Sequence, residues 1–441
     1  MDRAMTASEI GYLVEHLSMS YSGTSMEPYL ETGIPGTAVN PSGKPVMAFP
    51  LSEKSIDDGK VPFIDQLPVL FPCTENTEWY SREGSGIRFH HDILKSAFYL
   101  LSGYQEYHNE EVDEHGRFPW RLSVQHRLGF TGKPVVNYYF EIILEAYQLF
   151  CQANGLAFRR IPSENPVLFL SHDVDMLRKY TLRNMAYAGL QLLGLKPSTG
   201  SFRARWNNLL TYIRGILFSR EDPYWIFTEL ASLEERLGIT STWYFLEKTR
   251  GDNSTYHFRD QPVRQLMAEL ASRGHEIGIH GTLESSRDKD RMAGEIHRIN
   301  AVSEHPVQGI RQHYLRYSFP ETTRIQEERG LVYDASLGFA EQVGFRHSFT
   351  HPFRLYDFER QRSFGIWQLP LQVMEVSLLG YMGVEPEQVP GMVRSLAGEV
   401  RKFNGILSIL WHNSNLDEEV VPGINRVYEP VSYTHLRAHE T

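Results

Sequence analysis

Two stretches in the first third of the chain place apolar residues at helical spacing. In residues 91–107 the apolar positions are Ile93, Leu94, Ala97, Phe98, Leu101 and Tyr104. Residues 137–153 repeat this pattern before Gly155, which suits the left-handed position that ends many helices. We therefore predict two helices whose apolar faces lie in a core. Residues 110–117 between them are acidic and contain a glycine, which predicts a loop.

From residue 167 onward, short apolar runs alternate with segments of helical periodicity. The runs that predict strands are residues 167–171, 239–246, 276–280, 309–314, 331–336, 366–371 and 406–411. Residues 225–237 and 262–272 are examples of the helical segments between them. Such alternation is typical of a parallel sheet or barrel. We predict an α/β fold, a distorted (β/α) barrel of about seven strands, with a smaller mixed N-terminal domain.

The boundary between the two predicted domains lies at residues 161–166, which contain two prolines, a serine and an asparagine. We expect an N-terminal accessory domain over residues 1–162 and the barrel over residues 163–431. A long insertion, residues 177–221, has helical patterning and could form a lid or an oligomer surface. The last ten residues, 432–441, resemble a translated sequencing-adapter tail, so His435 and His439 are not counted as ligands.

Composition narrows the class of protein. Of 441 residues, 41% are hydrophobic, which is enough for a large core. The net charge of −10 disfavours a general attraction to nucleic acid or to an anionic membrane, although it leaves room for a local basic patch. Cys73 and Cys151 are too few for a disulfide framework. We see no membrane-spanning stretch and no signal peptide in residues 1–20, so we expect a cytoplasmic protein.

The first predicted strand ends in Ser171-His172-Asp173-Val174-Asp175. Two carboxylates so close together are electrostatically costly without a cation, and Asp and His are ordinary ligands of zinc and other divalent metals. The second carboxylate could be the base that activates a water molecule. The alternative is an Asp-x-Asp turn that only caps the following loop.

Three further predicted strands end in side chains that could take part in catalysis or metal binding. His280 ends the third strand, although it could equally be a structural histidine. Arg311 lies at the fourth, where it could hold a carboxylate by paired hydrogen bonds or form a solvated ion pair. His412 ends the last strand, where a general acid could lie.

In this order, the segments resemble the NodB-like polysaccharide deacetylase family, also called carbohydrate esterase family 4, over roughly residues 167–414. Residues 172–175 resemble its first motif, the segment that ends at His280 its second and residues 410–412 its fifth, while Arg311 opens its third. The first third resembles the extra N-terminal domain of a bacterial subgroup. Nothing in that third indicates a catalytic role.

The resemblance implies metal-assisted hydrolysis of an N-acetyl group on a sugar. It implies that Asp175 and His280 bind a divalent metal, zinc in the first place, with cobalt or manganese as alternatives. The family has a second histidine four residues after the first, but this chain has Glu284 there. Glu284 or His313 could complete the metal site, and we favour His313 because an imidazole restores the Asp-His-His donor set.

The resemblance also implies the proton-transfer groups. Asp173 would be the base that deprotonates water, and Arg311 would orient it. His412 would protonate the departing amine, and Asp334 would orient His412.

The leading hypothesis is a metal-dependent hydrolase that removes an N-acetyl group from an amino sugar or a polysaccharide precursor. The missing second histidine motivates an alternative, a catalytically degenerate carbohydrate-binding or scaffold protein. A third hypothesis keeps the hydrolase and changes the substrate to a non-sugar amide, because one scaffold can host several reactions.

Overall fold

A computed structural model describes residues 3–33, 44–56, 61–161, 165–197, 201–218, 222–249, 251–417, 424 and 427–429. The predicted tail at residues 432–441 lies outside these residues, as do parts of the predicted insertion and residue 162 at the predicted boundary.

The centre of the molecule is a sheet of eight parallel strands in the order β16-β13-β12-β11-β10-β9-β18-β17. Their bounds are β9 Val167–Val174, β10 Ser241–Leu246, β11 Glu276–Gly281, β12 Gly309–Gln312, β13 Tyr333–Asp334, β16 Trp367–Gln368, β17 Val373–Met374 and β18 Ile406–His412. The edge strands β16 and β17 do not pair with each other in the described chain, so the sheet forms a half-barrel. The predicted α/β class and distorted barrel are confirmed.

The strand count differs from the prediction, because the sheet has eight strands and not seven. The additional strand is β17, which has two residues and follows Pro370 closely. A run this short carries no periodicity, so its pairing with β18 decides its conformation.

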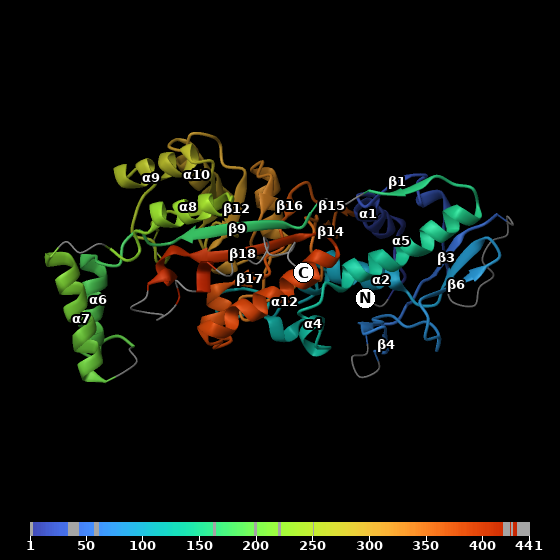
Figure 1. Cartoon of the computed structure of the whole chain (residues 1–441), viewed down its shortest axis with the longest axis horizontal. Coiled ribbons are helices and arrows are strands. Elements are labelled where there is room, and N and C mark those ends of the chain that lie inside the picture. The colour runs from blue at the N-terminus through green and yellow to red at the C-terminus, as the bar shows by residue number, and fades with distance from the viewer. Residues whose placement is uncertain are drawn as a thin grey trace.

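Helices pack on the sheet through apolar faces. α8 Phe227–Arg236, α9 Gln261–Ser272 and α10 Lys289–Asn300 lie on one side of β9 and β18, and α12 Val389–Lys402 lies on the other (Figure 1). α12 is an example of such an apolar face. Its buried residues Val389, Val393, Leu396 and Val400 repeat at helical spacing. A further short helix, α11 Glu321–Glu328, precedes β13.

The N-terminal region is a mixed α/β layer. α1 Ala7–Ser18 is followed by a four-stranded sheet in the order β2 Leu30–Gly33, β3 Met47–Pro50, β7 Gly86–Phe89 and β6 Tyr80–Glu83. β4 Phe63–Ile64 pairs with β5 Leu67–Pro68, and β1 Tyr21–Gly23 pairs with β8 Phe158–Arg160. The long helix α5 Val135–Ala153 contacts both β7 and α2 Ile93–Leu101. Both predicted apolar faces are buried.

The helix predicted over residues 91–107 is interrupted. α2 ends at Leu101, and Gly103 adopts a left-handed conformation with φ of +86° before the short helix α3 Tyr104–Tyr107. A Cβ atom at Gly103 would lie 3.0 Å from the ring of Phe319 and 3.1 Å from Leu355. The break therefore brings this part of the N-terminal region close against the barrel.

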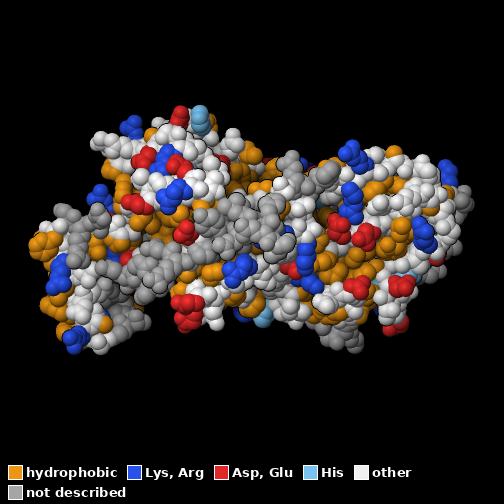
Figure 2. Space-filling view, viewed as in Figure 1, with side chains coloured by type: hydrophobic (Ala, Val, Ile, Leu, Met, Phe, Trp, Pro, Cys, Tyr) orange, Lys and Arg blue, Asp and Glu red, His pale blue; other side chains and the backbone are white. Residues whose placement is uncertain are grey.

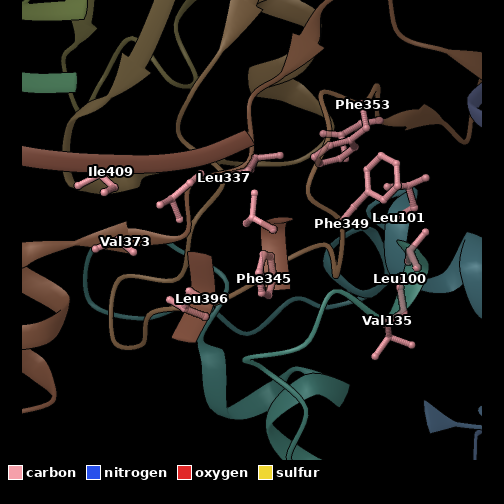
Figure 3. Packing of buried hydrophobic residues seen from close by; sticks show 14 of the residues in the cluster. Leu100, Leu101, Val135, Leu337, Phe345, Phe349, Phe353, Val373, Leu396 and Ile409 are labelled. Atoms are coloured by element: carbon pink, nitrogen blue, oxygen red, sulfur yellow. The ribbon is translucent and has the colours of Figure 1, made fainter. Parts of the chain in front are cut away.

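The hydrophobic core runs without interruption across the predicted domain boundary. Figure 3 shows Leu100, Leu101 and Val135 from the N-terminal region in one cluster with Phe349 and Phe353 of the barrel. A buried ion pair also joins the two parts, since Nε and Nη2 of Arg346 each donate to the Glu106 carboxylate at 2.7 Å. The N-terminal region and the barrel therefore share one hydrophobic core.

The predicted insertion contains two helices, α6 Leu182–Leu192 and α7 Phe202–Leu217, which project from one end of the molecule (Figure 1). They pack chiefly against each other. We call residues 182–197 and 201–218 the helical hairpin.

Candidate metal centre and active site

The end of β9 sends its polar side chains to two different faces of the sheet. Successive residues of a strand point in opposite directions, so His172 diverges from Asp173 and Asp175. His172 is buried against α8, where its Nε2 lies 2.7 Å from Glu234 Oε1, and its Nδ1 lies 3.0 Å from the carbonyl oxygen of Trp411. Only the two aspartates face the candidate site.

Three buried side chains from three neighbouring segments converge there. Asp175 follows β9, His280 lies in β11 and His313 follows β12, and one potential ligand atom of each lies within 4.8 Å of the others. His280 Nε2 is 3.4 Å from Asp175 Oδ1, and His313 Nε2 is 3.6 Å from Asp175 Oδ2. The parallel strands place these groups together because their carboxyl ends meet at one edge of the sheet.

Both histidines have their second ring nitrogen engaged. His280 Nδ1 donates to the carbonyl oxygen of Arg311 at 2.8 Å, and His313 Nδ1 donates to Asp252 Oδ1 at 2.7 Å. These partners engage Nδ1 and leave Nε2 of each ring directed at the cluster, which is the usual arrangement of histidine metal ligands.

The cluster has the character of a cation site. His280 Nε2 and Asp175 Oδ1 are buried and have no hydrogen-bond partner among the residues that the structure describes. Burial opposes ionisation of Asp175, but His313 and His280 nevertheless hold its pKa well below the usual range. Burial likewise opposes the charge on His313, yet Asp175 and Asp252 raise its pKa to about 9. The residues present fit a divalent metal with an Asp-His-His donor set.

Glu284, the other candidate ligand, lies outside this group. Its side chain is 58% exposed and pairs with Arg291. The geometry therefore brings His313, and not Glu284, to Asp175 and His280.

Asp173 lies beside the Asp-His-His cluster and is held by Arg311. The guanidinium Nη1 donates to Asp173 Oδ1 at 3.0 Å, and Nε donates to the carbonyl oxygen of Ala335 at 2.9 Å. The other carboxylate oxygen, Oδ2, lies 3.5 Å from His280 Nε2. Although burial favours the neutral acid, the neighbouring His280, Arg311 and His412 lower the pKa of Asp173. The carboxylate is therefore ionised.

His412 lies on the opposite side of Asp173, with 3.9 Å between its Nε2 and Asp173 Oδ2. Its Nδ1 donates to Glu375 Oε1 at 2.6 Å. Burial alone would lower the pKa of His412, but the carboxylates of Glu375, Asp175 and Asp173 raise it to about 10. The ring is therefore in its positively charged imidazolium form at neutral pH.

The predicted partner of His412 is wrong, because Glu375 and not Asp334 contacts the ring. Asp334 accepts hydrogen bonds from Ser336 and from Gln326 Nε2 at 2.7 Å. The sheet order gives the reason: β13, which carries Asp334, is five positions from β18, whereas Glu375 directly follows the neighbouring strand β17. Burial raises the pKa of Asp334 to about 6, consistent with a structural role.

A cavity of about 240 Å³ opens onto Asp173, Asp175, His313 and His412. A larger cavity of about 760 Å³ lies between the N-terminal region and the amino ends of β13, β16 and β18, and none of these four residues lines it. The smaller cavity is therefore the candidate active site, because these carboxylates and imidazoles line it.

The N-terminal region, in which the sequence indicates no catalytic role, forms part of the wall of this cavity. Arg117 donates to the carbonyl oxygen of Tyr314 and to the hydroxyl of Tyr381, both at 3.2 Å, and its Nε donates to Asp113 at 2.6 Å. The ring of His115 stacks on that of Tyr314 at a centroid distance of 4.5 Å. Tyr314 has φ of +59°, so these contacts hold a strained backbone directly after His313.

Sequence analysis thus missed Glu375, Asp252 and Arg117. Glu375 had a detectable signal, an acid directly after a short apolar run. The other two lie in loops, and their contacts join residues 61 and 197 positions apart, which no local pattern encodes.

The chain is similar to one family model and to several solved structures. A model for a family of unknown function, DUF7033, matches residues 37–150, within the predicted N-terminal domain. A search of curated proteins finds no match. Among solved structures, a protein from Mycobacterium smegmatis described as a polysaccharide deacetylase is 16% identical, with a TM-score of 0.41 over 64% of this chain and 87% of that chain.

Two other solved structures represent the range of activity. A chitin deacetylase from Colletotrichum lindemuthianum is 10% identical, with a TM-score of 0.30 over 62% of this chain and 84% of that chain. A CE4 family pseudoenzyme from Bacillus anthracis is 9% identical, with a TM-score of 0.30 over 60% of this chain and 62% of that chain. At these scores they carry no residue roles, which rest on the site itself.

Proposed function

We propose that the protein is a metal-dependent hydrolase that removes an N-acetyl group from an amino sugar. One observation carries the proposal: ionised Asp173 lies between a buried Asp-His-His cluster and a protonated imidazole. Its Oδ2 is 3.5 Å from His280 Nε2 and 3.9 Å from His412 Nε2. Amide hydrolysis needs a base for the attacking water and an acid for the departing amine, and the site has one of each.

Asp175, His280 and His313 would hold the metal, for which zinc suits the donors and cobalt or manganese are alternatives. When bound, a divalent ion lowers the pKa of water and polarises the carbonyl oxygen of the substrate. Asp252 and the carbonyl oxygen of Arg311 fix the tautomers of the two histidines, so that each presents Nε2.

Asp173 accepts the proton of the attacking water. Arg311 engages Oδ1, which leaves Oδ2 to face the site. His412 then donates its Nε2 proton to the amine nitrogen as the carbon–nitrogen bond breaks. Glu375 holds the opposite side of that ring and stabilises its positive charge, which keeps the acid charged until it is needed.

The substrate class rests on the motif resemblance together with the shape of the site. The cavity of about 240 Å³ is small for a ligand site and suits an acyl group with part of a ring. Tyr314 and Tyr381 line it and are 38% and 46% exposed, so part of each aromatic side chain is accessible to a sugar.

This geometry weakens the case for the alternative of a catalytically degenerate carbohydrate-binding or scaffold protein. It arose from the missing second histidine, and His313 supplies an imidazole at the corresponding donor position. A non-sugar amide remains the second candidate substrate, which the same residues could cleave.

The test is acetate release from a panel of N-acetylated sugars and non-sugar amides by metal-loaded protein. We expect release from a sugar that is lost in Asp173→Asn, while Glu284→Gln keeps full activity. No release from any sugar by protein that carries stoichiometric metal would contradict the proposal.

A further inference from the structure

The helical hairpin differs from the rest of the protein in charge. Residues 182–218 contain five basic residues, namely Arg183, Lys196, Arg203, Arg205 and Arg214, and no Asp or Glu. The whole chain has 54 acidic and 44 basic residues. One projecting element is therefore strongly positive on an acidic protein.

The hairpin also concentrates exposed hydrophobic side chains. Nine of the 17 large hydrophobic residues that are exposed in the described chain lie in it, although it is less than a tenth of the sequence. The nine are Leu182, Tyr187, Leu190, Leu193, Leu195, Phe202, Trp206, Leu217 and Phe218. Figure 2 shows hydrophobic and basic side chains side by side on this lobe. An exposed hydrophobic patch of this kind on a protein surface marks an interaction site.

These side chains follow helical spacing. In α6, Leu182, Ala186, Leu190 and Leu193 fall on one face, and all four are exposed. In α7, Phe202, Trp206 and Leu217 fall on one face and are also exposed. Met185 and Leu192 lie on another face of α6 and are half-buried, so α6 has an exposed apolar row beside a half-buried one.

The base of the hairpin is firmly held. Asp222 accepts hydrogen bonds from the backbone nitrogens of Lys179 and Tyr180 at 2.8 and 2.9 Å. Gly215 lets α7 approach Tyr180 closely, since a Cβ there would lie 2.3 Å from the ring. The exposed rows are thus presented on a fixed support.

We propose that the helical hairpin docks the protein on the surface of an anionic lipid bilayer. Exposed leucine and aromatic rows would enter the interface, and the arginines and lysines would meet lipid headgroups, which is the pattern of surface-bound amphipathic helices. No described helix has the length and hydropathy to cross a bilayer, so the contact is with the surface.

Two other occupants fit less well. A second copy would bring two sets of positive charge together. Nucleic acid would satisfy the arginines but would leave the leucines without a partner. The inference is independent of the proposed hydrolase activity.

The experiment is sedimentation of the full-length protein with vesicles. We expect binding to phosphatidylcholine vesicles that contain phosphatidylglycerol, weaker binding at high salt and little binding to phosphatidylcholine alone. Arg203→Glu with Arg214→Glu should lower binding at least about ten-fold, because each basic residue near the surface contributes on the order of 1 kcal/mol. The matched control, Arg264→Glu with Arg394→Glu, makes the same charge change at exposed sites on α9 and α12 and should bind as the wild type does.

The apolar row is tested by Leu193→Ser with Phe202→Ser, against Phe63→Ser, a residue that is 50% exposed in the N-terminal region. Only the hairpin pair should weaken vesicle binding, with circular dichroism unchanged in every variant. Equal binding to neutral and anionic vesicles, or full binding by the arginine pair, would overturn the proposal. A dimer in light scattering that dissociates in the hairpin variants would also overturn it. Binding to duplex DNA without binding to vesicles would do the same.

Discussion

The two faces of β9 carry buried polar clusters with opposite properties. On one face, both ring nitrogens of His172 have partners, and Glu234 accepts from Ser241 and Tyr428 as well. On the other face, His280 Nε2 and Asp175 Oδ1 are buried without partners in the described chain, beside a cavity. Adjacent residues, His172 and Asp173, thus belong to two different polar networks, and only that of Asp173 lines a cavity.

The sharpest test of this difference is Asp173→Asn. The amide keeps the shape of the side chain but cannot accept a proton from water, so we expect acetate release to fall by about 10²–10⁴-fold, the usual contribution of a general base. Metal content and unfolding midpoint should stay close to wild type. A variant with normal turnover would remove Asp173 from the mechanism.

The matching change on the other face is Glu234→Ala. It leaves His172 buried without its partner, and breaking a buried pair of this kind costs about 3–5 kcal/mol. Urea unfolding should show this loss, while any protein that remains folded should keep stoichiometric metal. Loss of metal at full stability would mean that the two faces are coupled.

A third buried histidine extends the comparison to pH. Burial lowers the pKa of His347 to about 4, despite Glu106 at 3.5 Å. Between its unfolded value of about 6.5 and the folded value, only the unfolded chain takes up the proton, so stability is lost as the pH falls through this window. His347→Asn should reduce the slope of stability against pH by up to about 1.4 kcal/mol per unit, as urea unfolding at several pH values would show. An unchanged slope would contradict the assignment.

Glu375→Gln gives the smallest of the expected effects. A neutral amide no longer stabilises the charged ring of His412, so we expect a fall of about 10–100-fold in turnover, in the range of lost contacts to catalytic side chains. The basic limb of the pH–rate profile should move to lower pH. Asp334→Asn is the control, since it contacts Ser336 and Gln326 instead, and it should leave that limb in place.

Sequence patterns predicted the strand ends better than the contacts among them. Asp173, Asp175, His280, Arg311 and His412 each lie at or next to the carboxyl end of a strand, and parallel strands bring such ends together. The interpretation of Asp334 failed because the partner of His412 depends on strand order, which places β17 beside β18. That order is set by packing across the whole sheet and leaves no trace in local periodicity.

The loop contacts were equally hidden from the sequence. Arg117 reaches Tyr314 from 197 positions away, and only the continuous core of the two parts brings them together. The charge of the helical hairpin, in contrast, is fully visible in the sequence, but its exposure is not.

The most direct test of the central claim is the metal content of the purified wild-type protein beside Asp175→Ala, His313→Ala and Glu284→Ala, with folding checked by circular dichroism. We predict near-stoichiometric divalent metal in the wild type and in Glu284→Ala, and its loss in folded Asp175→Ala and His313→Ala. A folded wild type that takes up no zinc, cobalt or manganese, or a His313→Ala variant that keeps full metal, would contradict the account.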